Sequence, residues 1–204
     1  MKTLRSLAII CSLLLFVAGA GQAAVYTFTP SPSDLNDLDH YWYYKWGISW
    51  AGHADETITE AVLKYTNIWD WQVEANDFLY THLLDNPAIG VKQFQDNQLG
   101  GDDFLGQGAW VGTWSDPNGG NNGANSINLT YRFSDLGLLD DLQAYAADGV
   151  FGFGIDPDCH YWNDGINFTV TTTRTTCVIP EPMSVMLGLA GLGAVAGFTR
   201  FRRK

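Results

Sequence analysis

The residues best suited to chemistry are oxygen donors gathered in segment 154–165, GIDPDCHYWNDG. Asp156, Asp158, Asn163 and Asp164 lie within nine residues of one another, and Ca²⁺ takes about six to eight oxygen ligands at about 2.3–2.6 Å. The spacing is not that of an EF-hand loop. Asp and Asn beside Pro157 also form turns by accepting local backbone N–H groups. The segment therefore predicts either a calcium site or a purely structural turn.

Aromatic residues provide a second candidate site, because the chain has eight tryptophans in 204 residues. Exposed Trp and Tyr rings offer flat apolar faces on which sugar rings can stack. Most of the tryptophans lie on alternating positions that must form the core. The residues at loop edges or out of phase with the core are the predicted carbohydrate contacts: Tyr41, Tyr43, Trp71 and Trp162.

Catalytic motifs are missing from the sequence: there is no GxSxG turn, HExxH helix, P-loop or GxGxxG turn. Glu60 and Glu74 are the one pair considered as glycosidase carboxylates, and an acidic chain produces such pairs by chance. We therefore predict that the protein is not an enzyme, with a glycoside hydrolase as an alternative. The histidines are not at metal-ligand spacing: His40, His53, His82 and His160.

The N-terminus has the pattern of a secretory signal peptide. Lys2 and Arg5 form a basic region, residues 7–17 are apolar, and small residues at Gly21 and Ala23 suit signal peptidase. We expect cleavage after Ala23, so that signal peptidase is a processing partner and 1–23 is removed.

The last 25 residues contain a Pro-Glu-Pro triplet, an apolar stretch over 183–198 and a basic end. As a helix, this stretch would reach roughly 24 Å into a bilayer core of about 30 Å. The basic end predicts a cytoplasmic C-terminus, with the preceding chain outside. The residues of this motif are Pro180, Glu181, Pro182, Arg200, Arg202, Arg203 and Lys204.

This order of features resembles the PEP-CTERM sorting signal of exported proteins in Gram-negative bacteria. The resemblance implies a transient inner-membrane intermediate, processing by the membrane protease-transferase exosortase, and delivery to the cell surface or extracellular matrix. It covers 179–204 and implies no activity. A plain anchoring helix is the alternative.

Export affects the interpretation of the cysteines. Cys11 should leave with the signal peptide, and an isolated pair in an oxidising compartment, Cys159 and Cys177, predicts a disulfide. The 17 residues between them would give about 3 kcal/mol of stabilisation by chain entropy. A metal site that uses Cys159 and His160 is the alternative.

Residues 24–178 remain as one domain, with 21 acidic and five basic residues, a net charge of −16. Nucleic acid is excluded as a partner because phosphate binding needs a basic surface. The acidic surface is compatible with divalent cations, with neutral extracellular polysaccharide, or with solubility alone.

Apolar residues in this domain recur with a period of two, which is typical of half-buried strands. The clearest examples are 42–50, 61–65, 127–133 and 166–170, and shorter candidates are 25–29, 78–83, 109–114 and 151–155. One short helix is expected, capped by Ser134 or Asp135 and ending at Asp148-Gly149. The predicted fold is an all-β antiparallel sandwich of jelly-roll type with one short helix.

Two acidic segments of the domain, DLDH followed by YKWGI at 37–48 and GIDPDCHYWNDGI at 154–166, resemble an uncharacterised β-sandwich module of PEP-CTERM proteins. The resemblance implies a fold but no activity. Together, these observations predict an exported cell-surface or matrix protein with a non-catalytic structural or binding role. A carbohydrate-binding module is the first alternative.

Overall fold

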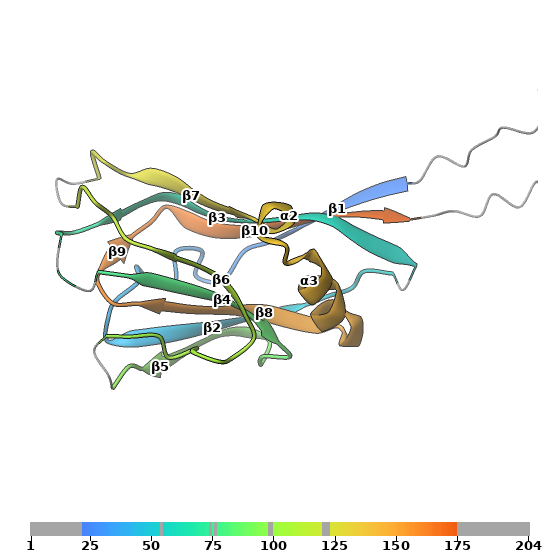
Figure 1. Cartoon of the computed structure of the whole chain (residues 1–204), viewed down its shortest axis with the longest axis horizontal. Helices are drawn as coiled ribbons and strands as arrows, with labels where there is room; N and C mark the ends of the chain where they lie inside the picture. Colours follow the sequence, from blue (N-terminus) through green and yellow to red (C-terminus); the bar gives the residue numbers. More distant parts are fainter. Residues whose placement is uncertain are drawn as a thin grey trace, which may run out of the picture. The chain divides into compact units, whose positions relative to one another are not determined.

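Two antiparallel β-sheets stack face to face in the part of the chain that the structure describes (Figure 1). The structure is a computed structural model, and it describes residues 22–174 except 54, 74, 76, 98–99 and 120–122. This part is one unit, Gln22–Arg174. The predicted all-β sandwich is confirmed.

The first sheet has the order β1-β10-β3-β7, with β9 paired to β3, and the second has the order β5-β2-β8-β4-β6. All neighbouring strands are antiparallel. The strands are β1 (Gln22–Phe28), β2 (Trp42–Ser49), β3 (Glu56–Asp70), β4 (Leu79–Asp85), β5 (Gly90–Gln95), β6 (Ala109–Trp114), β7 (Ile127–Arg132), β8 (Val150–Pro157), β9 (Tyr161–Trp162) and β10 (Gly165–Arg174).

Four of the strand pairs are nested in the sequence: β1 pairs with β10, β2 with β8, β3 with β7, and β4 with β6. Strands β1 to β4 alternate between the two sheets, so each connection must cross from one layer to the other. These crossings place connecting loops at the two ends of the sandwich. Gln22 and Arg174, which pair with each other, lie at one end (Figure 1).

Aromatic rings fill the space between the sheets. The rings of Phe153 in β8 and Phe168 in β10 lie 4.8 Å apart at 72°, and Phe151 and Phe133 also contact Phe168 edge-on or tilted. All four side chains are fully buried. In β10, every second residue from Ile166 to Thr172 is buried, as the period-two pattern predicts. The alternation of apolar residues therefore produces the core directly.

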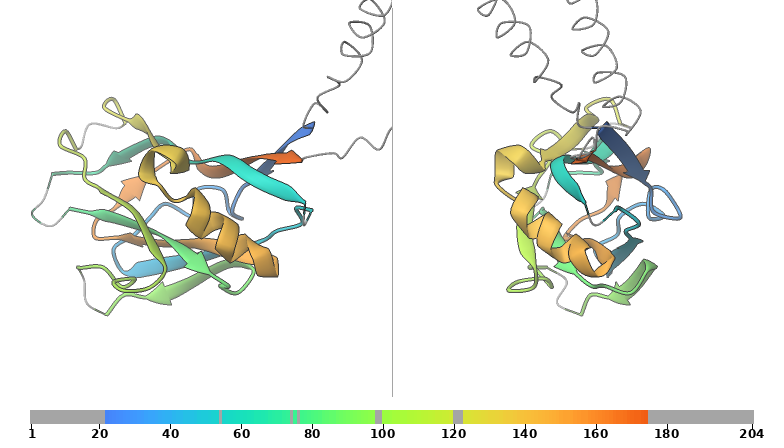
Figure 2. Two further views of the ribbon diagram at one scale, coloured as in Figure 1. Left: turned by 45° about the vertical axis from the view of Figure 1, so that its right-hand side comes forward. Right: turned by 90° about the vertical axis from the view of Figure 1, so that its right-hand side faces the viewer.

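The predicted single helix is wrong in one respect, because the segment forms two short helices. These are α2 (Phe133–Leu136) and α3 (Leu139–Tyr145), followed by a 3₁₀ turn, η1 (Ala146–Asp148). Gly137 separates them with a left-handed φ of 72°, and neither helix has a side-chain cap. Buried Leu138 and Leu142 pack the segment against the core along one open side of the sandwich (Figure 2).

Two strands, β5 and β9, were not predicted. β5 lies at the edge of the second sheet and pairs only with β2, and its side chains are exposed or half-buried. A strand without a buried face has no apolar alternation to detect. β9 has only two residues, Tyr161 and Trp162, which is too short for a period.

Several predictions lie outside the described residues: most of the signal peptide, the sorting segment 179–204, Cys177 and Glu74. The described part includes Gln22 and Ala23, which are the first residues of β1 and pair with Arg174 and Thr173. Among the described residues, no helix is both long and apolar enough to cross a membrane.

Replacing Phe168 by Ala should lower the free energy of unfolding by about 3–5 kcal/mol, because the change leaves a cavity between the sheets. Urea denaturation followed by tryptophan fluorescence measures the loss. Val25→Ala is the control, since Val25 is 65% exposed and should cost less than about 1 kcal/mol. Equal losses in the two variants would contradict this description of the core.

Candidate functional site

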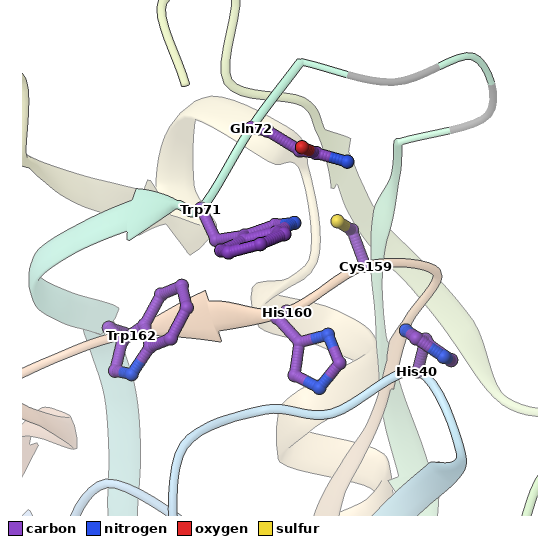
Figure 3. A pocket seen from close by; sticks show the side chains of 6 residues that line it. All are labelled: His40, Trp71, Gln72, Cys159, His160 and Trp162. Carbon is purple, nitrogen blue, oxygen red and sulfur yellow. The ribbon is translucent and has the colours of Figure 1, made fainter. Parts of the chain in front are cut away.

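A pocket of about 420 Å³ lies near the Asp70 end of β3, and Arg174 pairs with Glu56 at the other end of that strand. Figure 3 shows the side chains that line the pocket. Three connections build it: the approach to β2, the segment that follows β3, and the turn from β8 into β9. Nested pairing brings these connections together from distant parts of the sequence. The side chains that line the pocket are His40, Trp71, Gln72, Cys159, His160 and Trp162.

The short strand β9 positions one wall of the pocket. Trp162 is opposite Trp69 in the register of β9 with β3. Their rings stack 4.6 Å apart at 17°, so the ring of Trp162 is supported on one face by Trp69. Trp71 follows directly after β3, its backbone N–H donates to the carbonyl of His160 (3.3 Å), and its side chain is 51% exposed. The pocket therefore has two indole rings: that of Trp162, which is stacked on Trp69, and that of Trp71, which is exposed to solvent.

Polar groups gather at the rim of the pocket. His160 Nε2 lies 3.3 Å from Asp39 Oδ1, and the rings of His40 and His160 have centroids 4.6 Å apart. One ligand atom from each of these three residues lies within 4.8 Å of the others. A carboxylate and two imidazoles can bond to hydroxyl groups, and they are also ligand types that Zn²⁺ accepts. Sequence spacing gave no sign of this group, because residues 40 and 160 are far apart in the chain.

Buried acids lie beneath the pocket. Cys159 Sγ donates to Asp70 Oδ1 (3.2 Å), and the Tyr161 hydroxyl donates to Asp77 Oδ1 (2.7 Å). Burial, with the neighbouring carboxyl of Asp77, raises the pKa of Asp70 to about 7. Burial and the bond to Asp70 raise the pKa of the Cys159 thiol. The thiol is therefore protonated at neutral pH and unsuited to act as a nucleophile or metal ligand.

The disulfide predicted between Cys159 and Cys177 is not seen, and Cys177 lies outside the described residues. Strand geometry argues against the bridge. Cys159 bonds to Asp70 at one end of β3, whereas Arg174 pairs with Glu56 at the other end, about 45 Å away at 3.3 Å per residue. Three more residues extend about 10 Å at most, and a disulfide needs Cα atoms within about 7 Å.

The four predicted calcium ligands are divided between the two sheets. Asp156 is in β8 of the second sheet, and both carboxylate oxygens of Asp158 accept from Gly101 N (3.1 Å). In contrast, Asp164 Oδ2 accepts from Asn67 of β3 in the first sheet (2.6 Å). Asn163 makes a turn, bonding to Gly165 N and Asp34 O. Asn163 and Asp164 therefore have the structural role in a turn that was the alternative to calcium binding. Asp156 does not take part in this turn, because its carboxylate accepts from Asp103 N instead.

Two of the four predicted carbohydrate contacts, Trp71 and Trp162, line the pocket. Tyr41 is 51% exposed, and its ring lies 4.2 Å from that of His40. Tyr43 lies elsewhere, stacked on Phe94 at 5.2 Å on the outer face of the second sheet. Selecting aromatic residues at loop edges or out of phase with the core pattern thus identifies part of this pocket.

The glycosidase pair receives no support from Glu60. Burial raises the pKa of Glu60, but hydrogen bonds from Arg132 (2.9 Å) and Ser134 (2.9 Å) outweigh it and leave the pKa lowered. A general acid needs a raised pKa. Glu74 lies outside the described residues.

No protein-family model matches this chain, and a comparison with curated proteins finds no match.

The free energy of unfolding should fall as pH rises from about 4 to 7, partly because of Asp70. The folded state keeps this proton up to about pH 7, whereas the unfolded chain loses it near 3.8, so the folded state binds more protons in this window. The groups facing Asp70 are Asp77, Cys159 and Tyr161, and Asp116 accepts from its backbone N–H.

Asp70→Asn imitates the protonated carboxyl and should reduce this decline by at least 1 kcal/mol, because each pKa unit corresponds to about 1.4 kcal/mol. Urea titrations at pH 4.5 and 7.5 measure it. Asp148→Asn, at an exposed position, is the control. A decline of the same size in the Asp70 variant would show that Asp70 is ionised throughout.

Proposed function

We propose that this protein is an exported, surface-sorted binding protein without catalytic activity, and that its pocket binds a neutral polysaccharide. The observation that carries the proposal is the placement of Trp71 and Trp162 beside His40 and His160 in one pocket at one end of the sandwich. Aromatic surfaces with a few convergent polar groups are the usual composition of a small-molecule site.

The two indole rings suit the apolar face of a sugar ring. Trp162 rests on Trp69, so its orientation is fixed before a ligand arrives. A preformed platform loses little conformational entropy on binding. Trp71 is the more exposed ring and would contribute a second stacking surface.

The polar groups suit hydroxyl groups of the same ligand. Asp39 can accept hydrogen bonds, Gln72 can both donate and accept them, and each imidazole can donate or accept according to its tautomer. Net charge narrows the ligand class, because the domain 24–178 carries a net charge of −16 and would repel anionic glycans. A neutral polysaccharide is therefore the favoured ligand.

Strand order supports the jelly-roll type that the sequence predicts. Without β5 and β9, the sheets are β1-β10-β3-β7 and β2-β8-β4-β6, and the four nested pairs are those of a rolled hairpin. Lectin domains are among the proteins that use jelly rolls. This is an analogy of fold, and a shared fold does not by itself imply a shared function.

Sorting to the surface rests on the resemblance of 179–204 to the PEP-CTERM signal and on the signal-peptide pattern of 1–23. The fold is compatible with attachment beyond Arg174, because that residue lies at the end of the domain away from the pocket. A ligand site at the other end of the domain would remain accessible after such attachment.

The pocket predicts that Trp71→Ala and Trp162→Ala each weaken polysaccharide binding about 30-fold, the loss expected when a Trp that contributes about 2 kcal/mol is removed. Glycan-array screening of 24–178 identifies the ligand, and calorimetry with that ligand measures affinity. Trp110→Ala is the control, because Trp110 is 59% exposed on β6 and does not line the pocket. Unchanged binding in both pocket variants, or no bound glycan, would refute the proposal.

The sorting motif predicts that the mature protein lacks the segment from Pro180 onward. Intact-mass measurement of protein from the cell surface and the medium tests this. Replacing Pro180, Glu181 and Pro182 by Ala should leave the segment attached and retain the protein in the inner membrane. Recovery of surface protein that ends at Lys204 would contradict exosortase processing and favour a plain anchor.

A further inference from the structure

The connection from β5 to β6 crosses the outer face of the second sheet and is fixed there by several contacts. Phe104 is fully buried against Gly154 of β8, where a Cβ atom would lie only 2.6 Å from the phenyl ring. Asp102 Oδ2 bonds to His82 Nε2 of β4 (2.8 Å), and Gln107 O bonds to the other ring nitrogen (3.2 Å). The connection therefore covers the outward side chains of β8.

One of those outward side chains is an acid. Phe153 and Ile155 of β8 belong to the core, so Asp156 points to the opposite face. It is 0% exposed because the β5–β6 connection covers it. Its Oδ2 accepts from Asp103 N (2.7 Å), but its Oδ1 is buried and has no hydrogen-bond partner in the part of the chain that the structure describes. A buried carboxylate oxygen without a hydrogen bond lowers the stability of the folded state unless a cation or a donor binds to it.

Other carboxylates converge on the same place. Asp96, Asp103 and Asp156 each present a ligand atom within 4.8 Å of the others. No basic side chain of the described residues forms an ion pair with Asp156. Lys45 Nζ lies over the rings of Phe94 and Phe104 instead (5.5 and 5.7 Å). Three carboxyl groups therefore lie together, and one oxygen of Asp156 has no hydrogen-bond partner among the described residues.

We propose that Asp96, Asp103 and Asp156 form a Ca²⁺ site that fastens the β5–β6 connection to β8. Carboxylate oxygens that lie within 4.8 Å of one another can bind one Ca²⁺ ion, since ligands on opposite sides of that ion are about 4.6–5.2 Å apart, twice the usual bond length. Mg²⁺ demands a near-ideal octahedron and gives up its water reluctantly, and Zn²⁺ prefers nitrogen and sulfur ligands. Backbone carbonyls and water would complete the coordination.

This site is independent of the polysaccharide pocket and differs from the grouping that the sequence predicts. It keeps Asp156, replaces Asn163 and Asp164 by two acids some 50–60 positions earlier in the chain, and has Asp158 beside it, bonded to Gly101 of the same connection. Binding in the folded state alone raises stability by mass action. Calcium should therefore raise the melting temperature in proportion to the logarithm of its concentration above the Kd.

The test compares melting temperatures of residues 24–178 in EDTA and in 0.1–10 mM CaCl₂, with calorimetry for stoichiometry. We expect one ion per chain and a Kd of about 10⁻⁴–10⁻³ M, as in extracellular calcium modules. Asp156→Asn should lose most of the calcium-dependent rise. Asp164→Asn is the matched control and should keep it.

Asp103→Asn is a second variant for the case that Asp156→Asn does not fold. The hydrogen bond from Asp103 to Asp156 uses the backbone N–H and is kept in this variant. This variant too should lose the rise. Identical melting curves in EDTA and calcium for the wild-type protein would overturn the proposal. So would a rise that Asp164→Asn abolishes and Asp156→Asn retains, or an equal response to MgCl₂.

Discussion

The burial of both faces of β8 is the constraint on which much of this structure depends. One face carries the core residues Phe151, Phe153 and Ile155. The other face is covered by chain, so that Gly152 and Gly154 have no room for a side chain: a Cβ atom would lie 2.2 Å from Trp46 O at the first and 2.6 Å from the Phe104 ring at the second. Apolar burial on both sides stabilises the strand and makes any polar residue on it a functional candidate. Asp156 is that residue.

Much of the fold could be predicted because burial on one face leaves a period of two in the sequence. The strand 109–114 was predicted with its observed bounds, and β2, β7 and β10 within a few residues. The prediction failed where that signal is weak. β5 is an exposed edge strand, and the helical segment is divided by the left-handed Gly137, whose effect depends on how the chain must turn to reach β8.

The sites were less predictable, because they depend on contacts between distant residues. Trp71 and Trp162 could be selected since each departs from the core phase, but Asp39 and His160 meet only after the β1–β2 and β8–β9 connections reach the same end of the sandwich. The closeness of the acids in sequence does not place them at one site. Asp156 and Asp164 belong to the same short segment, yet Asp156 pairs with Tyr80 of β4 in the second sheet, and Asp164 accepts a hydrogen bond from Asn67 of β3 in the first. Long-range pairing, not spacing, decides which oxygens converge.

The position of β10 also has a mechanical consequence. It lies between β1 and β3, with its first residue near the pocket end and Arg174 at the opposite end. If the pocket binds a polymer and the chain is attached beyond Arg174, as proposed above, tension would run along this strand. The hydrogen bonds between antiparallel strands are perpendicular to the strands. Force along β10 would therefore act in shear on all its hydrogen bonds to β1 and β3 at the same time, and these bonds would not break one after another. The geometry suits a domain that must resist tension between its two ends.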